Sequence, residues 1–120
     1  KVVICSGKIY YELFMERNKR NLKEVYLLRL EQLYPFPSQS MMKELSRFKN
    51  AKITWCQEEP RNQGAWFFVE PILEMILGHI SHSSGRADYA GRQSAASPAT
   101  GLAKQHIEQQ GKLIDQALEV

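Results

Sequence analysis

The chain has 120 residues, of which 43% are hydrophobic and 24% charged, and its formal net charge is +3. This length suits one domain with one hydrophobic core, and the composition argues against a chain that is disordered throughout. The small positive charge, with Lys and Arg interspersed among Glu, argues against nucleic acid as a partner, and no apolar run approaches the about 20 residues that a membrane helix needs.

The first half of the chain predicts three strands separated by two helices. Short apolar runs with β-branched residues are typical of strands buried on both faces of a sheet, and they occupy residues 1–5, 25–30 and 52–56. Apolar residues at helical spacing follow the first two runs, over residues 10–17 and 41–48. The stretch Tyr34-Pro35-Phe36-Pro37 interrupts regular structure before the second helix, because proline lacks a backbone N–H and restricts the preceding residue.

The second half predicts two further helices and a weak strand. A polar loop over residues 58–64 precedes a helix that begins at Trp66. Residues 87–90 predict a short strand, and Ser97-Pro98 predicts the cap and first turn of the last helix. The alternating order indicates an α/β fold with three layers, in which helices cover both faces of a mostly parallel sheet of about five strands.

Residues 1–120 are predicted to form a single domain. Because the sequence opens directly in a strand, we expect this domain to be a fragment of a much longer chain. Cys5 and Cys56 lie inside apolar runs and are predicted to be buried free thiols in a reducing environment. The loop histidines His79 and His82 have no Cys or carboxylate beside them, so no metal site is predicted.

An anion site is predicted where the first two strands end. Ser6 and Gly7 form the turn into the first helix, whose leading N–H groups are unpaired, and Lys8 adds a positive charge. Consecutive parallel strands are commonly neighbours, so Arg29 at the end of the second strand is placed near the same pocket. Ser6, Lys8 and Arg29 are therefore candidate ligands for a phosphate or CoA group, although solvated surface charges are the alternative.

The polar loop after the third strand offers two interpretations. Glu58 and Glu59 would perform acid–base chemistry if their environments separated their pKa values, but neighbours at a strand end usually point in different directions. In the favoured interpretation the loop contacts a partner, and Trp66 supplies an aromatic anchor.

Four segments resemble one family, the thiamine-diphosphate-dependent 2-oxoglutarate dehydrogenases. Cys5-Ser6-Gly7-Lys8 is similar to the end of their first strand in this domain, and Glu31-Gln32-Leu33-Tyr34-Pro35-Phe36-Pro37 to a turn of theirs. Trp55-Cys56-Gln57-Glu58-Glu59-Pro60 with Asn62-Gln63-Gly64-Ala65-Trp66, and Tyr89-Ala90-Gly91-Arg92 with Ser94–Gly101, resemble two further segments. The resemblance covers essentially the whole chain, in order.

The resemblance implies a C-terminal domain with the fold of the transketolase C-terminal domain. The implied parent enzyme is a homodimer of the tricarboxylic acid cycle, cytoplasmic and bacterial rather than mitochondrial. It decarboxylates 2-oxoglutarate on thiamine diphosphate and Mg²⁺ and succinylates the lipoyl group of the dihydrolipoyl succinyltransferase. Catalytic and cofactor residues belong to earlier domains, so the isolated fragment is expected to be inactive and to bind no cofactor. The residues expected at an interface are Glu58, Glu59, Asn62, Gln63, Trp66, Tyr89 and Arg92.

Three functions from different classes follow. The first is a non-catalytic assembly domain whose partners are the remaining domains of the same chain and a second subunit. The second, which can coexist with the first, is an effector-binding module for a CoA-type or phosphorylated ligand. The third is an independent small enzyme that uses Glu58 and Glu59.

Overall fold

The structure, a computed structural model, describes residues 1–96 and 102–120, so the predicted helix cap Ser97-Pro98 lies outside the described residues. The strands are β1 (Val2–Ser6), β2 (Tyr26–Leu30), β3 (Ile53–Pro60) and β4 (Asp88–Arg92). The helices are α1 (Ile9–Lys19), α2 (Ser38–Leu45), α3 (Trp66–His79) and α4 (Ala103–Leu118), with a short 3-10 turn, η1 (Ser46–Phe48), after α2.

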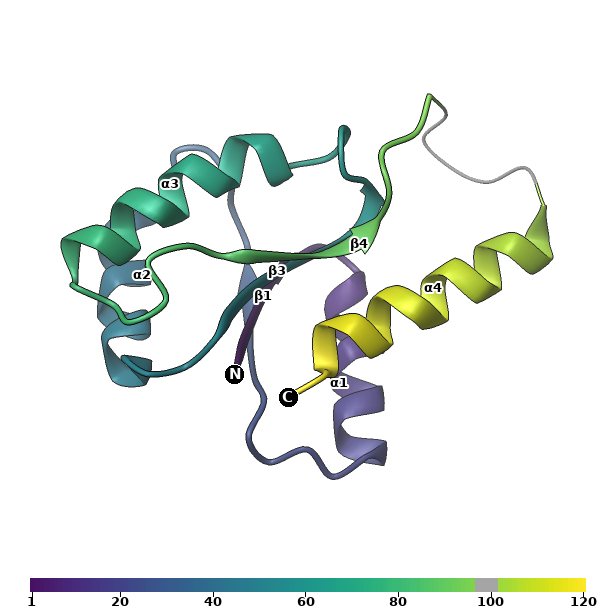
Figure 1. The fold of residues 1–120 in the computed structure, drawn as a ribbon, viewed down its shortest axis with the longest axis horizontal. Helices are drawn as coiled ribbons and strands as arrows, with labels where there is room; N and C mark the ends of the chain where they lie inside the picture. Colours follow the sequence, from purple (N-terminus) through teal and green to yellow (C-terminus); the bar gives the residue numbers. More distant parts are fainter. Residues whose placement is uncertain (97–101) are drawn as a thin grey trace.

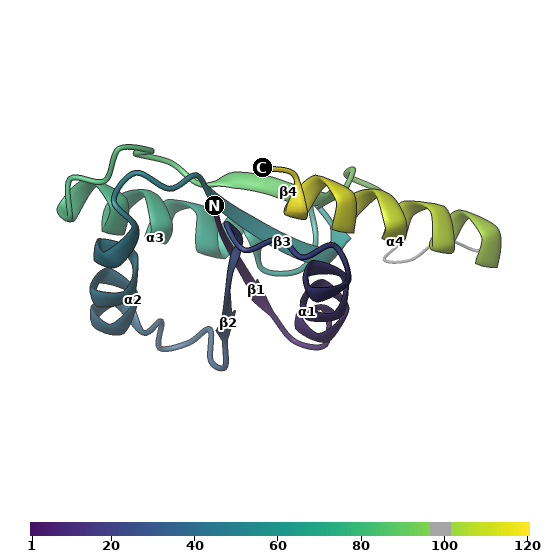
Figure 2. The same ribbon diagram turned by 90° about the horizontal axis from the view of Figure 1, so that it is seen from below.

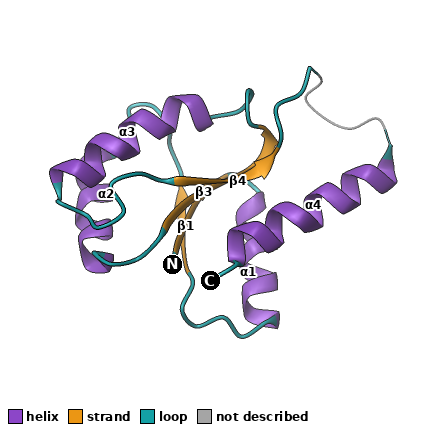
Figure 3. Ribbon diagram, viewed as in Figure 1, coloured by secondary structure: helices purple, strands orange, loops and turns teal. Residues whose placement is uncertain are grey.

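The strands form one parallel sheet in the order β2-β1-β3-β4. Figure 2 labels all four strands, and Figure 3 shows β1, β3 and β4. Within the described residues the sheet therefore has four strands, where the sequence predicted about five. β1 is central and pairs with β2 on one side and β3 on the other. Because the chain winds outward in both directions from β1, the gap between the carboxyl ends of β1 and β3 is the point where parallel sheets of this kind commonly bind ligands.

Two hydrophobic clusters lie on opposite faces of this sheet, as the predicted three layers require. Alternation along β1 directs Val2 and Ile4 into the cluster beneath α2 and α3, and Val3 and Cys5 into the cluster beneath α1 and α4. Figures 1 and 2 show the two pairs of helices on either side of the strands. All four of these β1 side chains are fully buried, because the central strand is covered on both faces.

The third and fourth strands extend further than their apolar runs. β3 continues to Pro60, so the first residues of the predicted loop, 58–60, belong to the strand and the loop is shorter than predicted. β4 continues to Arg92, beyond the predicted end at residue 90. Pro60 lies opposite Arg92 after an irregularity in the register, and the N–H of Arg61 donates to the carbonyl oxygen of Arg92 at 3.0 Å. Pairing with a distant strand, rather than local apolar character, thus sets where both strands end.

Candidate functional site

A pocket of about 510 Å³ lies at the carboxyl ends of β1 and β3, on the face that α2 and α3 cover. Aromatic side chains supply much of its wall, and the residues that line it are Ser6, Gly7, Leu33, Tyr34, Trp55, Gln57, Glu59, Gly64, Ala65 and Phe68. The only charged side chain among them is the carboxylate of Glu59. The pocket beside Ser6 therefore favours an apolar or cationic group and disfavours the predicted anion.

Lys8 and Arg29 do not join Ser6 at this pocket, which corrects the predicted anion site. The Nζ of Lys8 lies 2.8 Å from Oε1 of Glu58 and pairs with it. The guanidinium of Arg29 lies 5.1 Å over the ring of Tyr11 and donates to its hydroxyl at 3.2 Å. Each cation is held by a nearby side chain on the α1 face of the sheet, whereas Ser6 lines the pocket on the other face, so the three residues do not line one pocket.

Glu58 and Glu59 point to opposite faces of the sheet. Glu58 turns toward α1 and α4, where it accepts hydrogen bonds from Lys8 and from Nε2 of Gln110 at 2.9 Å. Glu59 is exposed and lines the pocket on the α2 and α3 side. Two carboxylates separated by the sheet cannot act on one substrate as an acid and a base, so this arrangement argues against the independent enzyme.

Arg92 joins the ends of β3 and β4 to the last helix. Its guanidinium donates to the backbone carbonyl of Glu58, to Oε1 of Gln109 at 3.1 Å and to Oε1 of Gln110 at 2.7 Å. Gln110 is buried, and its Nε2 also donates to Oε2 of Glu12 at 2.9 Å on α1. These contacts hold α4 against the sheet, so the Arg92 side chain is engaged within the domain.

Gln57 is a buried polar side chain for which no role was predicted from the sequence. It is 3% exposed, and its Oε1 accepts hydrogen bonds from the indole N–H of Trp55 and the backbone N–H of Trp66, both at 3.0 Å. Its Nε2 donates to the carbonyl oxygens of Glu59, Pro60 and Gln63 at 2.8–3.1 Å. Its position two residues after Trp55, on the same face of β3, was the available signal of burial.

Trp66 is a core residue, which corrects its predicted role as an interface anchor. Its side chain is 1% exposed because the first turn of α3 directs it onto the sheet, into the cluster that contains Val69 and Leu73. Its ring centroid lies 5.3 Å from that of Tyr89, whose hydroxyl donates to the carbonyl of Arg92 at 2.7 Å. A side chain that the domain covers in this way has no surface to offer a partner.

Asn62 and Gln63, in the loop after β3, form hydrogen bonds with the segment after β4. Oδ1 of Asn62 accepts from the N–H of Ala95 at 3.0 Å, and its Nδ2 donates to the carbonyl of Ala95 at 2.9 Å. Nε2 of Gln63 donates to the same carbonyl at 3.0 Å. The predicted contact loop is therefore two segments held together at one end of the sheet, with Glu59 and Asn62 exposed beside them.

The loop histidine His82 is buried and structural. Its Nε2 lies 2.7 Å from the carbonyl oxygen of Phe48, and the N–H of Ser84 donates to its Nδ1 at 3.1 Å. Over residues 1–96 and 102–120, no group of three or more His, Cys, Asp or Glu side chains is placed to hold a metal ion. None of the helices in the same ranges is long and apolar enough to cross a membrane.

Cys5 and Cys56 are free and buried, as predicted, and we expect them to be chemically inert in the folded domain. Burial raises the pKa of each thiol to about 12, so almost none of either is the reactive thiolate at pH 8. A thiol-specific disulfide reagent at pH 8 should label both only in denaturant, and the folded protein should react at least about a hundredfold more slowly than the denatured one. Rapid labelling without denaturant would contradict this burial.

Comparison with known proteins confirms the resemblance that the motifs carry. Residues 1–118 match the family described as "2-oxoglutarate dehydrogenase C-terminal". Proteins named "2-oxoglutarate dehydrogenase E1 component" from Brucella anthropi, Brucella ovis and Brucella canis are each 55% identical to the chain over 118 residues. The match covers 98% of this chain but only 12% of the length of each relative. The chain belongs to the 2-oxoglutarate dehydrogenase C-terminal family.

Proposed function

We propose that this chain serves as the C-terminal assembly domain of a 2-oxoglutarate dehydrogenase E1 component. The complete enzyme decarboxylates 2-oxoglutarate on thiamine diphosphate and Mg²⁺ and passes the succinyl group to the lipoyl arm of the dihydrolipoyl succinyltransferase, in the tricarboxylic acid cycle. The observation that carries the proposal is the match over residues 1–118 to relatives of which the chain spans only 12%. The bacterial sources of these relatives favour the bacterial cytoplasm over the mitochondrial matrix.

Among residues 1–96 and 102–120, no set of side chains suits thiamine diphosphate with its metal. The described part of the chain has no cluster of acidic or histidine side chains for a metal, and the sequence has no diphosphate–magnesium signature. Lys8 and Arg29, the candidate cations for a diphosphate, are held by Glu58 and Tyr11. The cofactor chemistry is therefore assigned to other domains of the complete enzyme, and no catalytic step is assigned to this one.

Exposed apolar side chains support an assembly role. Large hydrophobic residues are about half exposed on the outer surfaces of two helices that cover opposite faces of the sheet. They are Tyr11 (55%), Phe14 (44%) and Met15 (71%) on α1, and Phe67 (58%), Phe68 (42%) and Met75 (61%) on α3. Exposed groups of large apolar side chains are typical of protein–protein contacts, which suits docking to the remaining domains of the same chain and to the second subunit of a homodimer.

The loop that carries Glu59, Asn62 and Gln63 is the second part of the proposed interface. Asn62 and Glu59 are exposed at the end of the sheet where the apolar pocket opens. Polar groups around an apolar centre are the usual anatomy of an interface. Glu58, Tyr89 and Arg92 contribute to the proposed contact indirectly, because their bonds within the domain hold this surface in place.

We expect the isolated domain neither to bind thiamine diphosphate nor to decarboxylate 2-oxoglutarate. Isothermal titration calorimetry with thiamine diphosphate and Mg²⁺ should give no binding heat for residues 1–120, whereas the complete enzyme should bind the cofactor. Circular dichroism and a cooperative thermal transition are the control for folding of the isolated domain. Tight, Mg²⁺-dependent binding of thiamine diphosphate to the isolated domain would overturn the proposal that other domains bind the cofactor.

A further inference from the structure

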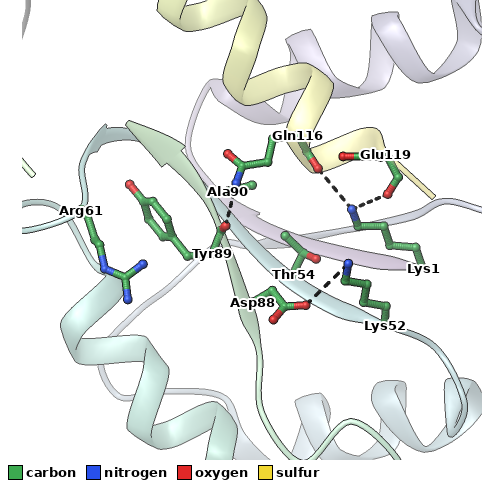
Figure 4. A pocket seen from close by; sticks show the side chains of 9 residues that line it. All are labelled: Lys1, Lys52, Thr54, Arg61, Asp88, Tyr89, Ala90, Gln116 and Glu119. Carbon is green, nitrogen blue, oxygen red and sulfur yellow. Dashed lines mark hydrogen bonds and ion pairs between the residues drawn. The ribbon is translucent and has the colours of Figure 1, made fainter. Parts of the chain in front are cut away.

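A second pocket lies beside β4 and the end of α4 and has no part in the proposed function. It has a volume of about 370 Å³ and extends from Lys1 and Lys52, just before β1 and β3, along β4 to Arg61, beside the end of α4 (Figure 4). The residues that line it are Lys1, Lys52, Thr54, Arg61, Asp88, Tyr89, Ala90, Gln116 and Glu119. A volume of this size accommodates a small molecule.

Two ammonium groups meet in this pocket with incomplete compensation. Nζ of Lys1 donates to the backbone carbonyls of Gln116 at 3.3 Å and Glu119 at 2.6 Å, and Nζ of Lys52 lies 3.9 Å from Oδ2 of Asp88. Burial lowers the pKa of the side-chain amine of Lys1, and the positive charge of Lys52 lowers it further. The carboxylates of Glu119 and Asp88 offset this lowering only in part. An ammonium has three protons, so the described residues leave at least one proton of Lys1 and two of Lys52 without an acceptor.

A buried hydroxyl faces the same space. Thr54 is 2% exposed, and its Oγ1 is buried with no hydrogen-bond partner among the described residues. Figure 4 shows its side chain between those of Asp88 and the two lysines. A buried hydroxyl without a hydrogen-bond partner costs free energy, and a ligand atom that accepts a hydrogen bond from it would remove this cost. The hydroxyl and the ammonium protons are all donors, which indicates an acceptor ligand with negative charge.

We propose that this pocket binds a phosphate group, free or as a monoester, held by Lys1, Lys52 and the hydroxyl of Thr54. Phosphate oxygens accept several charge-assisted hydrogen bonds at once, and lysine binds them as a point charge. Asp88 and Glu119 are the competing anions, but the pair of Asp88 with Lys52 is long, and these two side chains are 60% and 63% exposed. Such a pair contributes little free energy, so its displacement by phosphate costs little.

The test is calorimetric titration of the full chain with inorganic phosphate at constant ionic strength, with chloride as the exchanged anion. We expect measurable binding that weakens about tenfold or more in Lys52→Met, which keeps the aliphatic stem, and in Thr54→Val, which keeps the shape. Lys43→Met is the matched control, because Lys43 is an exposed lysine on α2, which covers the other face of the sheet, and its affinity should equal that of the unmodified protein. Absence of binding, or equal affinity in Lys52→Met, would overturn the proposal.

A footprint on the unmodified protein provides a second measurement that does not depend on variants folding. Phosphate should slow reductive methylation of Lys1 and Lys52, read by mass spectrometry, while Lys43 reacts at its rate in chloride. Equal rates at all three lysines, with and without phosphate, would contradict the site. Glycerol phosphate distinguishes the sources: affinity about tenfold above that of inorganic phosphate assigns the site to a phosphorylated metabolite, and equal affinity assigns it to free phosphate.

Discussion

Gln57→Glu is expected to lower the free energy of unfolding by about 3 kcal/mol or more at pH 7, because it places a carboxylate against carbonyl oxygens. The amide of Gln57 donates to the carbonyls of Glu59, Pro60 and Gln63, and the change replaces this donor with an acceptor of the same size. Water cannot compensate the loss, since the side chain is 3% exposed. Urea denaturation at pH 7 measures the effect.

The pH dependence of this variant distinguishes electrostatic repulsion from a change of shape. Burial beside carbonyl oxygens should raise the pKa of the introduced carboxyl above its value in the unfolded chain, about 4.3. The folded state then binds the proton more tightly, so the variant should lose stability relative to the wild-type protein as the pH rises above about 4. Gln63→Glu is the matched control: Gln63 is half-buried and donates one side-chain hydrogen bond, so its loss should be about 1 kcal/mol or less. A deficit in Gln57→Glu that is independent of pH would contradict the burial of an ionised group.

Local sequence was sufficient to predict the strands because their apolar runs are continuous. β1 and the first half of β3 are buried on both faces, and this burial requires the runs that the sequence displays. The side-by-side placement of β1 and β2 was also predictable, and the structure pairs Cys5 with Arg29 in parallel register. The last residues of β3 and β4 were not predictable, because Pro60 and Arg92 become strand residues only through pairing with each other.

The partners of long polar and charged side chains could not be predicted from the local sequence. Lys8 ends on Glu58, 50 residues away in the sequence, and Gln110 reaches Glu12, 98 residues away. Long flexible side chains select partners that only the folded chain brings near, so the spacing of Lys8 and Arg29 in the sequence did not reveal that each is held by a different side chain. The opposite orientation of Glu58 and Glu59, in contrast, follows from the alternation of a strand.

Two sets of hydrogen bonds at this end of the sheet, those of Gln57 and those of Arg92, have a shared consequence for assembly. Gln57 fixes the turn between β3 and α3, and Arg92 fixes α4 to the ends of β3 and β4. Both are inside the domain, yet both support the loop that carries Glu59 and Asn62. In the proposed assembly role the polar interior thus shapes the surface that a partner would meet.

Trp66→Ala is expected to destabilise the domain itself by about 3–5 kcal/mol, the usual cost of removing a large aromatic side chain from a core. The indole is 1% exposed and packs against Tyr89 and the cluster beneath α3, so truncation leaves a cavity beside the sheet. The loss is a large fraction of the stability of a domain this size. Thermal and urea unfolding of residues 1–120 measure it.

Phe67→Ala provides the matched control for this last prediction, because Phe67 is the next residue of the same helix and is 58% exposed. Its truncation removes a similar aromatic group from solvent-facing surface and should change stability by about 0.5 kcal/mol or less. In the complete enzyme, Phe67→Ala should weaken the association of the dimer and leave the stability of the domain unchanged, if α3 docks as proposed. Equal stability of the two variants in the isolated domain would show that Trp66 is not a core residue.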